Sequence, residues 1–352
     1  MNSLTIALAS LGGVVLAGVI AHGAWQARKA GPKRATPSVR EEPSANAPML
    51  PGSSTPDNDI EHDGEGDTAM LARRLSKRLP LQLDALIDAF VPIELDAPVA
   101  GDAVLANLPS KRHVGSKLVL VEGLAVESGH WRPIAAGERY SELQAGVQLA
   151  SRTGALNEIE YSEFVQRMQT FAEAIGGSID PPDMLDVMAR ARELDAFASQ
   201  HDAQLAVHLH ARGAAWSVGY IQQHARRHGF VPGVVAGRLV YPSAEEGAPP
   251  VLTLTFDSQA ALADEPDRAA VRDVTLAFDV PQTDPAAEPF KAWQAAAQAL
   301  AVGMDAAIVD DDERALSTPG FESIGAELGN LYAALDSRDL AAGSVAARRL
   351  FS

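Results

Sequence analysis

Four histidines have the spacings that zinc sites use. His208 and His210 are two residues apart in "AQLAVHLHA", a period-two pattern typical of a strand. His224 and His228 are four residues apart in "YIQQHARRHGF", where a helical pattern points both side chains the same way. That helix is expected to cover the face of the strand opposite to the two strand histidines. The two pairs therefore do not converge, and a zinc site is not favoured.

Acidic clusters are the second candidate for metal chemistry. The run from Asp310 to Glu313 leaves an expected strand, which favours a solvated loop over a divalent-metal site. In "DNDIEHDGEGD" the acids from Asp57 to Asp63 alternate, but the glycine and distal glutamate of an EF-hand are not at their spacings. The chain has no cysteine, Walker loop, nucleophile elbow or dinucleotide fingerprint. We therefore expect no enzyme activity and no cofactor or metal.

The first 27 residues are expected to form a transmembrane anchor. The segment from Leu4 to Trp25 has few polar side chains and is long enough to cross the hydrocarbon core as a helix. Arg28 and Lys29 follow it, whereas no cation precedes it, which favours an anchor over a cleaved signal peptide. The same charge asymmetry places the cations and the rest of the chain in the cytoplasm.

Small residues recur at every fourth position of this apolar segment, at Ala9, Gly13, Ala17 and Ala21. This spacing allows two helices to approach closely, so weak self-association is expected. Residues 1–40 carry five cations and no acid, although the whole chain has a net charge of -17. A protein this acidic is not expected to bind nucleic acid through bulk charge, whereas its N-terminal end suits an anionic bilayer surface.

Residues 28–68 are expected to form a disordered linker, because they are rich in Pro, Ser, Gly and acid and poor in hydrophobic side chains. The next stretch, "AMLARRLSKRLP", places leucines on one helical stripe surrounded by cations. This short amphipathic segment either returns to the membrane surface or packs onto the domain that follows; the second alternative is favoured, because so short a helix is marginal alone.

The remainder reads as two copies of one α+β domain, over residues 69–200 and 201–352. An offset of 129 residues superposes "AGVQLAS" on "VTLAFDV", two period-two strands of the same parity. The offset continues into helices whose apolar stripes match, and then brings Ile179 onto Ile308 in a short strand. Asp180 before Pro181 and Thr318 before Pro319 are expected to cap the next helix of each copy.

Each copy is expected to contain one mainly antiparallel sheet with helices on a single face, which leaves the other face open. The second copy resembles the C-terminal domain of the ZipA family of bacterial cell-division proteins, on "YIQQHARRHGF", "VTLAFDVP", "PFKAWQAAAQALA" and "AIVDDDERALSTPG". The order of anchor, tether and domain is similar too. The resemblance implies a single-pass inner-membrane protein with a periplasmic N-terminus, which holds the C-terminal peptide of the tubulin-like protein FtsZ on the open sheet face.

Two departures from the family pattern concern the site. The linker is short and the domain is doubled, and the open face of the second copy is expected to be polar, through residues such as His208 and Thr275. In the first copy the strand "KLVLVEG" is apolar on both faces. Either a partner peptide covers the open face there or the two copies pack together. The candidate peptide-binding residues are Phe90, Val119, Val121 and Trp131. The alternative function is a membrane-tethered scaffold for another cytoplasmic protein.

Overall fold

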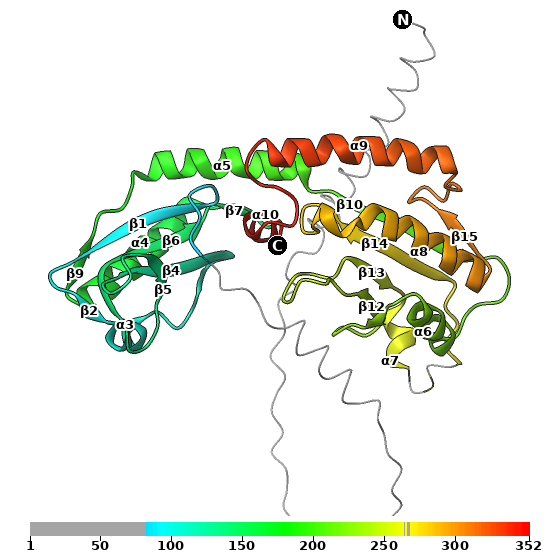
Figure 1. Ribbon diagram of the computed structural model, residues 1–352, viewed down its shortest axis with the longest axis horizontal. Helices are drawn as coiled ribbons and strands as arrows, with labels where there is room; N and C mark the ends of the chain where they lie inside the picture. The colour runs from blue at the N-terminus through cyan, green and yellow to red at the C-terminus, as the bar shows by residue number, and fades with distance from the viewer. Residues whose placement is uncertain (1–81, 264, 266–267) are drawn as a thin grey trace, which may run out of the picture.

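A computed structural model of the chain describes residues 82–263, 265 and 268–352. These residues form two antiparallel sheets with helices packed against them, which confirms the predicted α+β class (Figure 1). Within them, no helix combines the length and the hydropathy that a bilayer span needs. The predicted anchor and linker, with Leu4, Trp25, Arg28 and Lys29, lie outside the described residues.

The first sheet has the strand order β3-β4-β6-β1-β9, with β2 paired to β6 and β5 paired to β4. Its elements are β1 (Asp88–Leu95), β2 (Val99–Ala100), α3 (Gly101–Asn107), β3 (His113–Val114), β4 (Lys117–Ala125), β5 (Trp131–Pro133), β6 (Arg139–Gln148) and β9 (Gly177–Ile179). A small hairpin, β7 (Ala150–Ser151) and β8 (Gly154–Ala155), follows β6, and the helices α4 (Glu158–Ala174) and α5 (Met184–His201) complete this part.

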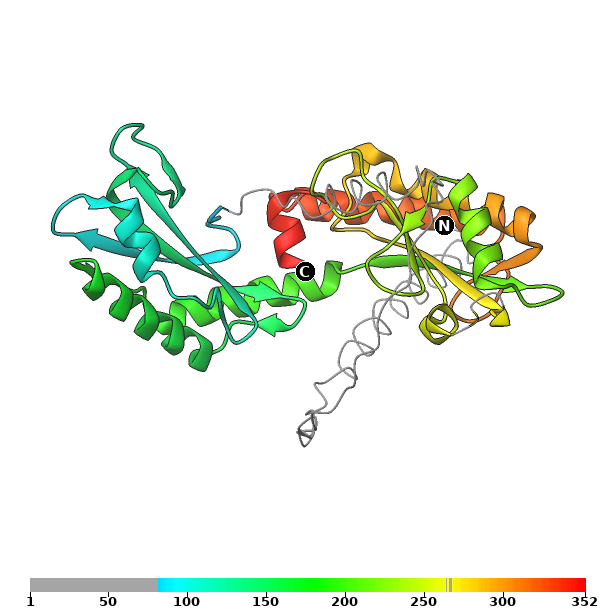
Figure 2. The same ribbon diagram turned by 90° about the horizontal axis from the view of Figure 1, so that it is seen from below.

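Helix α4 covers one face of the first sheet because its sequence supplies both a cap and an apolar stripe. Asn157 accepts hydrogen bonds from the backbone amides of Ile159 and Glu160, and Glu160 reaches back to the amide of Asn157 to close a capping box. Buried Phe164 and three further stripe residues pack against the sheet: Tyr161, Met168 and Phe171. In Figure 2 the green helices α4 and α5 line one side of this sheet.

The second sheet has the order β11-β12-β13-β14-β10-β15. Its elements are β10 (Gln204–Ala211), α6 (Val218–Arg227), β11 (Val231–Pro232), β12 (Arg238–Tyr241), β13 (Leu252–Thr255), α7 (Ser258–Leu262), β14 (Asp273–Asp279), the 3-10 turn η2 (Pro285–Ala287), α8 (Pro289–Met304), β15 (Ala306–Val309), α9 (Thr318–Asp336) and α10 (Val345–Leu350). Trp293 of α8 is buried against Phe278 and donates its indole N–H to Leu276 O at 2.9 Å, which seats α8 on the sheet.

The central strands of the two sheets correspond in order: β4-β6-β1-β9 matches β13-β14-β10-β15. Strands β6 and β14, and helices α4 and α8, lie at the offset that the sequence repeat predicts. The edge strands match less closely, because Ile179 pairs with Ile93 whereas Ile308 pairs with Leu209. The first sheet ends before residue 180 and the second begins after residue 203, although independent folding of the two parts stays a prediction.

Two predicted helix starts are wrong by one to three residues. Helix α5 begins at Met184 and is capped by Asp183, whose carboxylate accepts hydrogen bonds from two backbone amides, so Asp180 is not its cap. The N-cap of α9 is Ser317, because Thr318 already belongs to the helix. In both cases a second polar residue close by, Asp183 or Ser317, is the actual cap, so the proline alone did not fix the position of the cap.

A third apolar cluster joins the two copies. Figure 1 shows α5 and α9 meeting at their C-terminal ends in the middle of the molecule, with α10 beneath them. The buried cluster consists of Ile87, Ala150, Ala198, Leu335, Leu340, Ala342, Ala346, Ala347, Leu350 and Phe351. The copies are therefore joined through helix ends, the β7 hairpin and the C-terminal segment, and this segment also bonds Asp88 and Gln148 on the face of the first sheet opposite α4.

Two arginines make three ion pairs at this junction. Arg349 of α10 makes a bidentate pair with Asp88 of β1, at 2.6 and 2.9 Å, and both side chains are buried. Arg152 bonds to Asp202 at 2.6 Å and Asp279 at 2.7 Å, across the boundary between the copies. Because an arginine fork suits a carboxylate bidentately, these contacts hold one orientation of the copies.

Candidate functional site

The candidate site is the face of the first sheet that points away from α4. We call this surface the open face; its apolar side chains are Phe90, Leu118, Leu120, Leu124 and Trp131. The strand registers place Phe90 opposite Gly146, and Gly146 opposite Leu120, so these three residues form one row across β1, β6 and β4. At the edge, Trp131 lies opposite Leu124 and is 38% exposed. Leu120 and Gly146 are buried and Phe90 is partly exposed, so the exposed apolar surface lies at Phe90, Leu124 and Trp131. Apolar surface across neighbouring strands suits an extended peptide.

Of the four residues predicted to bind a peptide, only Phe90 and Trp131 lie on this face. Val119 pairs with Val147 and Val121 pairs with Ala145, and both partners belong to the core beneath α4. Assigning Val119 and Val121 to the groove was therefore wrong, because alternation turns their side chains toward the helix.

Sequence reasoning placed β4 in the sheet with an open face but assigned the wrong residues of this strand to that face. The residues it missed are Leu120, Leu124 and Gly146. Leu120 and Leu124 point to the open face from β4, where Leu124 lies opposite Trp131, and Gly146 lies between Phe90 and Leu120. A strand that is apolar on both faces carries no internal signal of parity. The partner strand β6 does carry such a signal, because its alternation predicts that Ala145 and Val147 are buried. Residues that lie opposite each other in paired strands point to the same face, so Val119 and Val121 of β4 are buried with them.

The corresponding face of the second sheet is polar. The row equivalent to Phe90, Gly146 and Leu120 is formed by His208, Thr275 and Thr255. His208 Nδ1 lies 3.1 Å from Thr275 Oγ1, and its Nε2 lies 2.8 Å from a carboxylate oxygen of Asp311. The second copy therefore offers hydrogen-bonding and charged groups where the first copy offers apolar ones.

The histidines do not form one metal site. His208 and His210 are each paired with a different carboxylate, Asp311 and Asp273, and on α6 the His224 ring packs on Tyr220. Burial is the main cause that lowers the pKa of His224. Across the part of the chain that the structure describes, no three His, Cys, Asp or Glu side chains are grouped as metal ligands.

In the acidic run at the end of β15, Asp311 pairs with His208, whereas Asp310 and Asp312 are bonded within their own turn. Asp310 accepts hydrogen bonds from the backbone amides of Asp312 and Arg314, and its carboxylate also pairs with the Arg314 guanidinium. A second carboxylate, on Asp312, lies 2.7 Å from the same guanidinium. These contacts close a turn of the solvated kind that the sequence favours over a metal loop.

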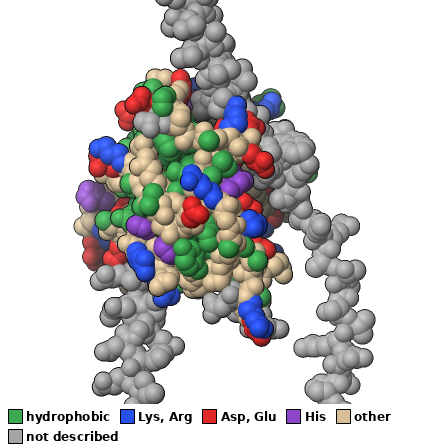
Figure 3. Space-filling view, turned by 90° about the vertical axis from the view of Figure 1, so that its right-hand side faces the viewer, with side chains coloured by type: hydrophobic (Ala, Val, Ile, Leu, Met, Phe, Trp, Pro, Cys, Tyr) green, Lys and Arg blue, Asp and Glu red, His purple; other side chains and the backbone are tan. Residues whose placement is uncertain are grey.

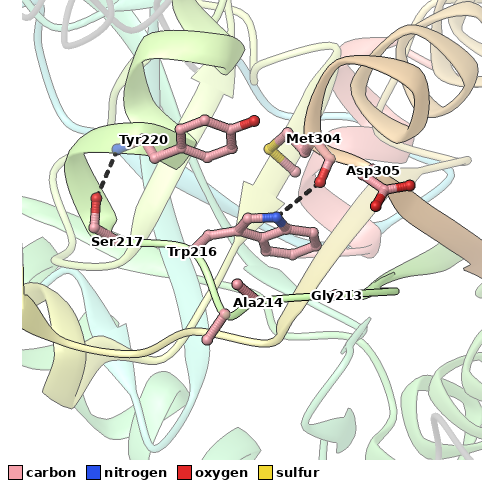
Figure 4. Close-up of a pocket in the computed structure, with 8 residues that line it drawn as sticks. Gly213, Ala214, Trp216, Ser217, Tyr220, Met304 and Asp305 are labelled. Carbon is pink, nitrogen blue, oxygen red and sulfur yellow. Dashed lines mark hydrogen bonds between the residues drawn. The ribbon is translucent and has the colours of Figure 1, made fainter.

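A hollow of about 470 Å³ opens between β10, α6 and the end of α8 in the second copy (Figure 4). Its aromatic walls are already bonded to the backbone: Trp216 Nε1 donates to Met304 O at 2.8 Å, and the Tyr220 hydroxyl donates to Gly303 O. Ser217 accepts from the Tyr220 amide as the cap of α6. Figure 3 views this end of the molecule, where hydrophobic and charged side chains are interspersed. These hydrogen bonds of the walls hold α6 and the segment before it against the end of α8.

A buried lysine beside a serine has the composition of a nucleophile and its base. Lys117 Nζ lies 3.0 Å from Ser151 Oγ, and burial lowers the pKa of Lys117. The same ammonium also donates to Thr153 Oγ1 and to Gly154 O, so its three donors all have partners. The contacts close the β7–β8 hairpin over β4, which makes Lys117 a structural clamp.

The open face of the first sheet thus presents partly exposed apolar side chains, Phe90, Leu124 and Trp131, whereas the other candidates are bonded internally. In comparisons with known proteins, no family model matches this chain and no curated protein is significantly similar to it.

Proposed function

We propose that the protein is a membrane-tethered anchor for FtsZ in bacterial cell division, and that it binds the FtsZ C-terminal peptide on the open face of the first sheet. One observation carries this proposal: Phe90 and Trp131 keep exposed apolar surface on the open face, whereas α10 of the second copy bonds this face at its Asp88 and Gln148 end. Of the two explanations that the sequence allows for such a face, we favour a partner peptide, because packing of the two copies leaves Phe90 and Trp131 partly exposed.

The binding energy on this surface is expected to come from a few apolar anchors. The chain has a net charge of -17, so it would repel an acidic peptide rather than attract it. Trp131 at the edge and Phe90 in the central row offer large apolar side chains that a bound peptide would bury. Truncation of a central anchor of this kind costs about 2 kcal/mol or more.

The membrane part of the proposal rests on sequence. The apolar segment from Leu4 to Trp25, followed by Arg28 and Lys29, has the length and charge asymmetry of a single-pass anchor with a cytoplasmic C-terminal part. The acidic linker after it would keep the two copies away from an anionic surface and extend their reach.

The test is a titration of a labelled peptide that copies the FtsZ C-terminal tail against the full-length chain in mild detergent. We expect Trp131→Ala and Phe90→Ala each to weaken binding about thirtyfold, because each removes a proposed anchor. His208→Ala, on the equivalent row of the second sheet, serves as the matched control and should leave affinity unchanged. Equal affinities for all four proteins would place the peptide elsewhere, and no binding to any of them would contradict the FtsZ assignment.

A further inference from the structure

The chain already places one of its own segments on the open face. Residues 82–86 precede β1, and Leu83 reaches back over β6. A Cβ built on Gly146 would lie only 2.2 Å from Leu83 Cδ2, so the leucine side chain occupies the space that the missing Cβ leaves. Gly146 is flanked by Phe90 and Leu120 in its row, which makes this space a notch between two apolar side chains.

Two buried charged residues hold the backbone of this segment. Glu122 of β4 accepts a hydrogen bond from the Leu83 amide at 2.8 Å, and its other oxygen accepts from Gln144 Nε2 at 3.2 Å. Arg349 donates to the carbonyl oxygen of Gln82 at 2.9 Å. The first copy therefore contacts the side chain of Leu83, the backbone amide of Leu83 and the carbonyl oxygen of Gln82, as a peptide-binding site contacts a bound peptide.

The second copy lacks this arrangement. Thr275 stands where the first copy has Gly146, and its hydroxyl is bonded to His208. The notch is thus a feature of the first copy alone, on the face where the proposed function puts the partner.

We propose that residues 82–84 are an internal pseudo-ligand, and that the partner peptide binds by inserting a leucine-like side chain into the Gly146 notch in place of Leu83. This inference rests on the proposed function for the identity of the partner. It adds a sequence specificity: the peptide must carry an aliphatic residue whose backbone amide bonds to Glu122, and the carbonyl of the residue before it must bond to Arg349. It also adds a regulation, because a tethered occupant competes at a high effective concentration and lowers the apparent affinity of any free peptide.

The test uses the full-length chain and two labelled peptides. One copies the FtsZ tail, and the other, "PLQLDAL", copies residues 80–86 of this chain. Leu83→Ala should empty the notch and tighten the binding of both peptides by about tenfold, since the competent state becomes more populated. Leu86→Ala, in the same segment but 43% exposed, is the matched control and should bind as the parent does.

A second variant fills the notch. Adding Gly146→Ala to Leu83→Ala places a methyl group where Leu83 lay, next to Asp88 Cβ at an ordinary 3.5 Å, and should abolish the gain for both peptides. Circular dichroism checks that each variant folds.

The outcomes separate the two proposals. If "PLQLDAL" binds Leu83→Ala more tightly than the parent and loses that gain when Gly146→Ala is added, but the FtsZ peptide binds none of the proteins, the pseudo-ligand stands and the FtsZ assignment fails. If the FtsZ peptide binds the parent and all variants equally, the FtsZ assignment stands and the pseudo-ligand is overturned. If "PLQLDAL" binds Leu83→Ala no better than the parent at millimolar concentration, the pseudo-ligand is overturned as well.

Discussion

Replacing Arg349 by methionine should destabilise the junction between the two copies. The Arg349 and Asp88 side chains are 5% and 1% exposed, and the substitution leaves a buried carboxylate without its partner. Breaking a buried ion pair from one side costs about 3–5 kcal/mol. For a chain of this size each kcal/mol corresponds to roughly 2–4 °C of unfolding temperature. We therefore expect Arg349→Met to lower the unfolding temperature by about 10 °C.

The loss should depend on pH. Burial raises the pKa of Asp88 above its ordinary range, while the hydrogen bonds and charge of Arg349 oppose that rise. Without Arg349 the pKa rises further, so the folded variant holds a proton at pH values where the unfolded chain has lost it. Stability falls with rising pH wherever the folded state binds more protons. The deficit of Arg349→Met should therefore be larger at pH 7.5 than at pH 5.

The assay is thermal unfolding of the full-length chain in mild detergent, followed by near-ultraviolet circular dichroism. Arg348→Met is the matched control, because Arg348 pairs with Glu245, whose side chain is 46% exposed, and such a pair contributes about 1 kcal/mol or less. Adding Asp88→Asn to Arg349→Met should recover at least half of the loss, since the uncompensated charge is gone. Equal effects of the two arginine variants, or a deficit that grows toward acid, would refute the reasoning.

Three further predictions concern the core and the membrane. Val121→Asp should lower the unfolding temperature even where no peptide is present, because Val121 packs against the core beneath α4; a folded variant of unchanged stability would contradict this. Gly123→Ala should destabilise the chain by about 1–3 kcal/mol, since its Cβ would lie 2.3 Å from the buried Tyr140 ring, whereas Gly329→Ala in exposed α9 should stabilise it slightly in the same denaturant titration. Protease added outside spheroplasts should leave the chain after Trp25 intact, and digestion of the bulk from outside would reverse the proposed topology.

The elements that the sequence predicted best are those with a strong internal period. Helices α4 and α8 and strands β6 and β14 were located by matching apolar patterns at one offset, because burial of a single face imposes that period. The start of α5 was missed by three residues, since Asp180 and Asp183 both precede a helical stretch and the choice depends on local backbone geometry.

The residues of the open face were only half predictable from the sequence. Phe90 and Trp131 were identified correctly as residues of the open face, but Val119 and Val121 were not, since parity in a doubly apolar strand is set by the partner strand. The Gly146 notch was invisible, because a glycine in a strand gives no hint of what fills its missing side chain.

The C-terminal segment was equally hidden. Arg349 and Asp88 are separated by 261 positions. Arg349 follows Arg348 directly, and the sequence of such a charged pair is typical of a solvated surface. Only the fold brings α10 against β1, where the arginine both closes the junction between the copies and contacts the segment on the open face. Contacts of such sequence separation carry no local signal.

The measurement that tests the central claim most directly is photo-crosslinking of an FtsZ tail peptide to the full-length chain, mapped by mass spectrometry. With the photoreactive group placed beside a leucine-like residue of the peptide, the account predicts crosslinks to β1, β4 and β5 of the first copy, near Phe90, Leu120 and Trp131. Competition by unlabelled peptide should remove them. Crosslinks confined to the second sheet or to the helical faces, or none that unlabelled peptide displaces, would contradict it.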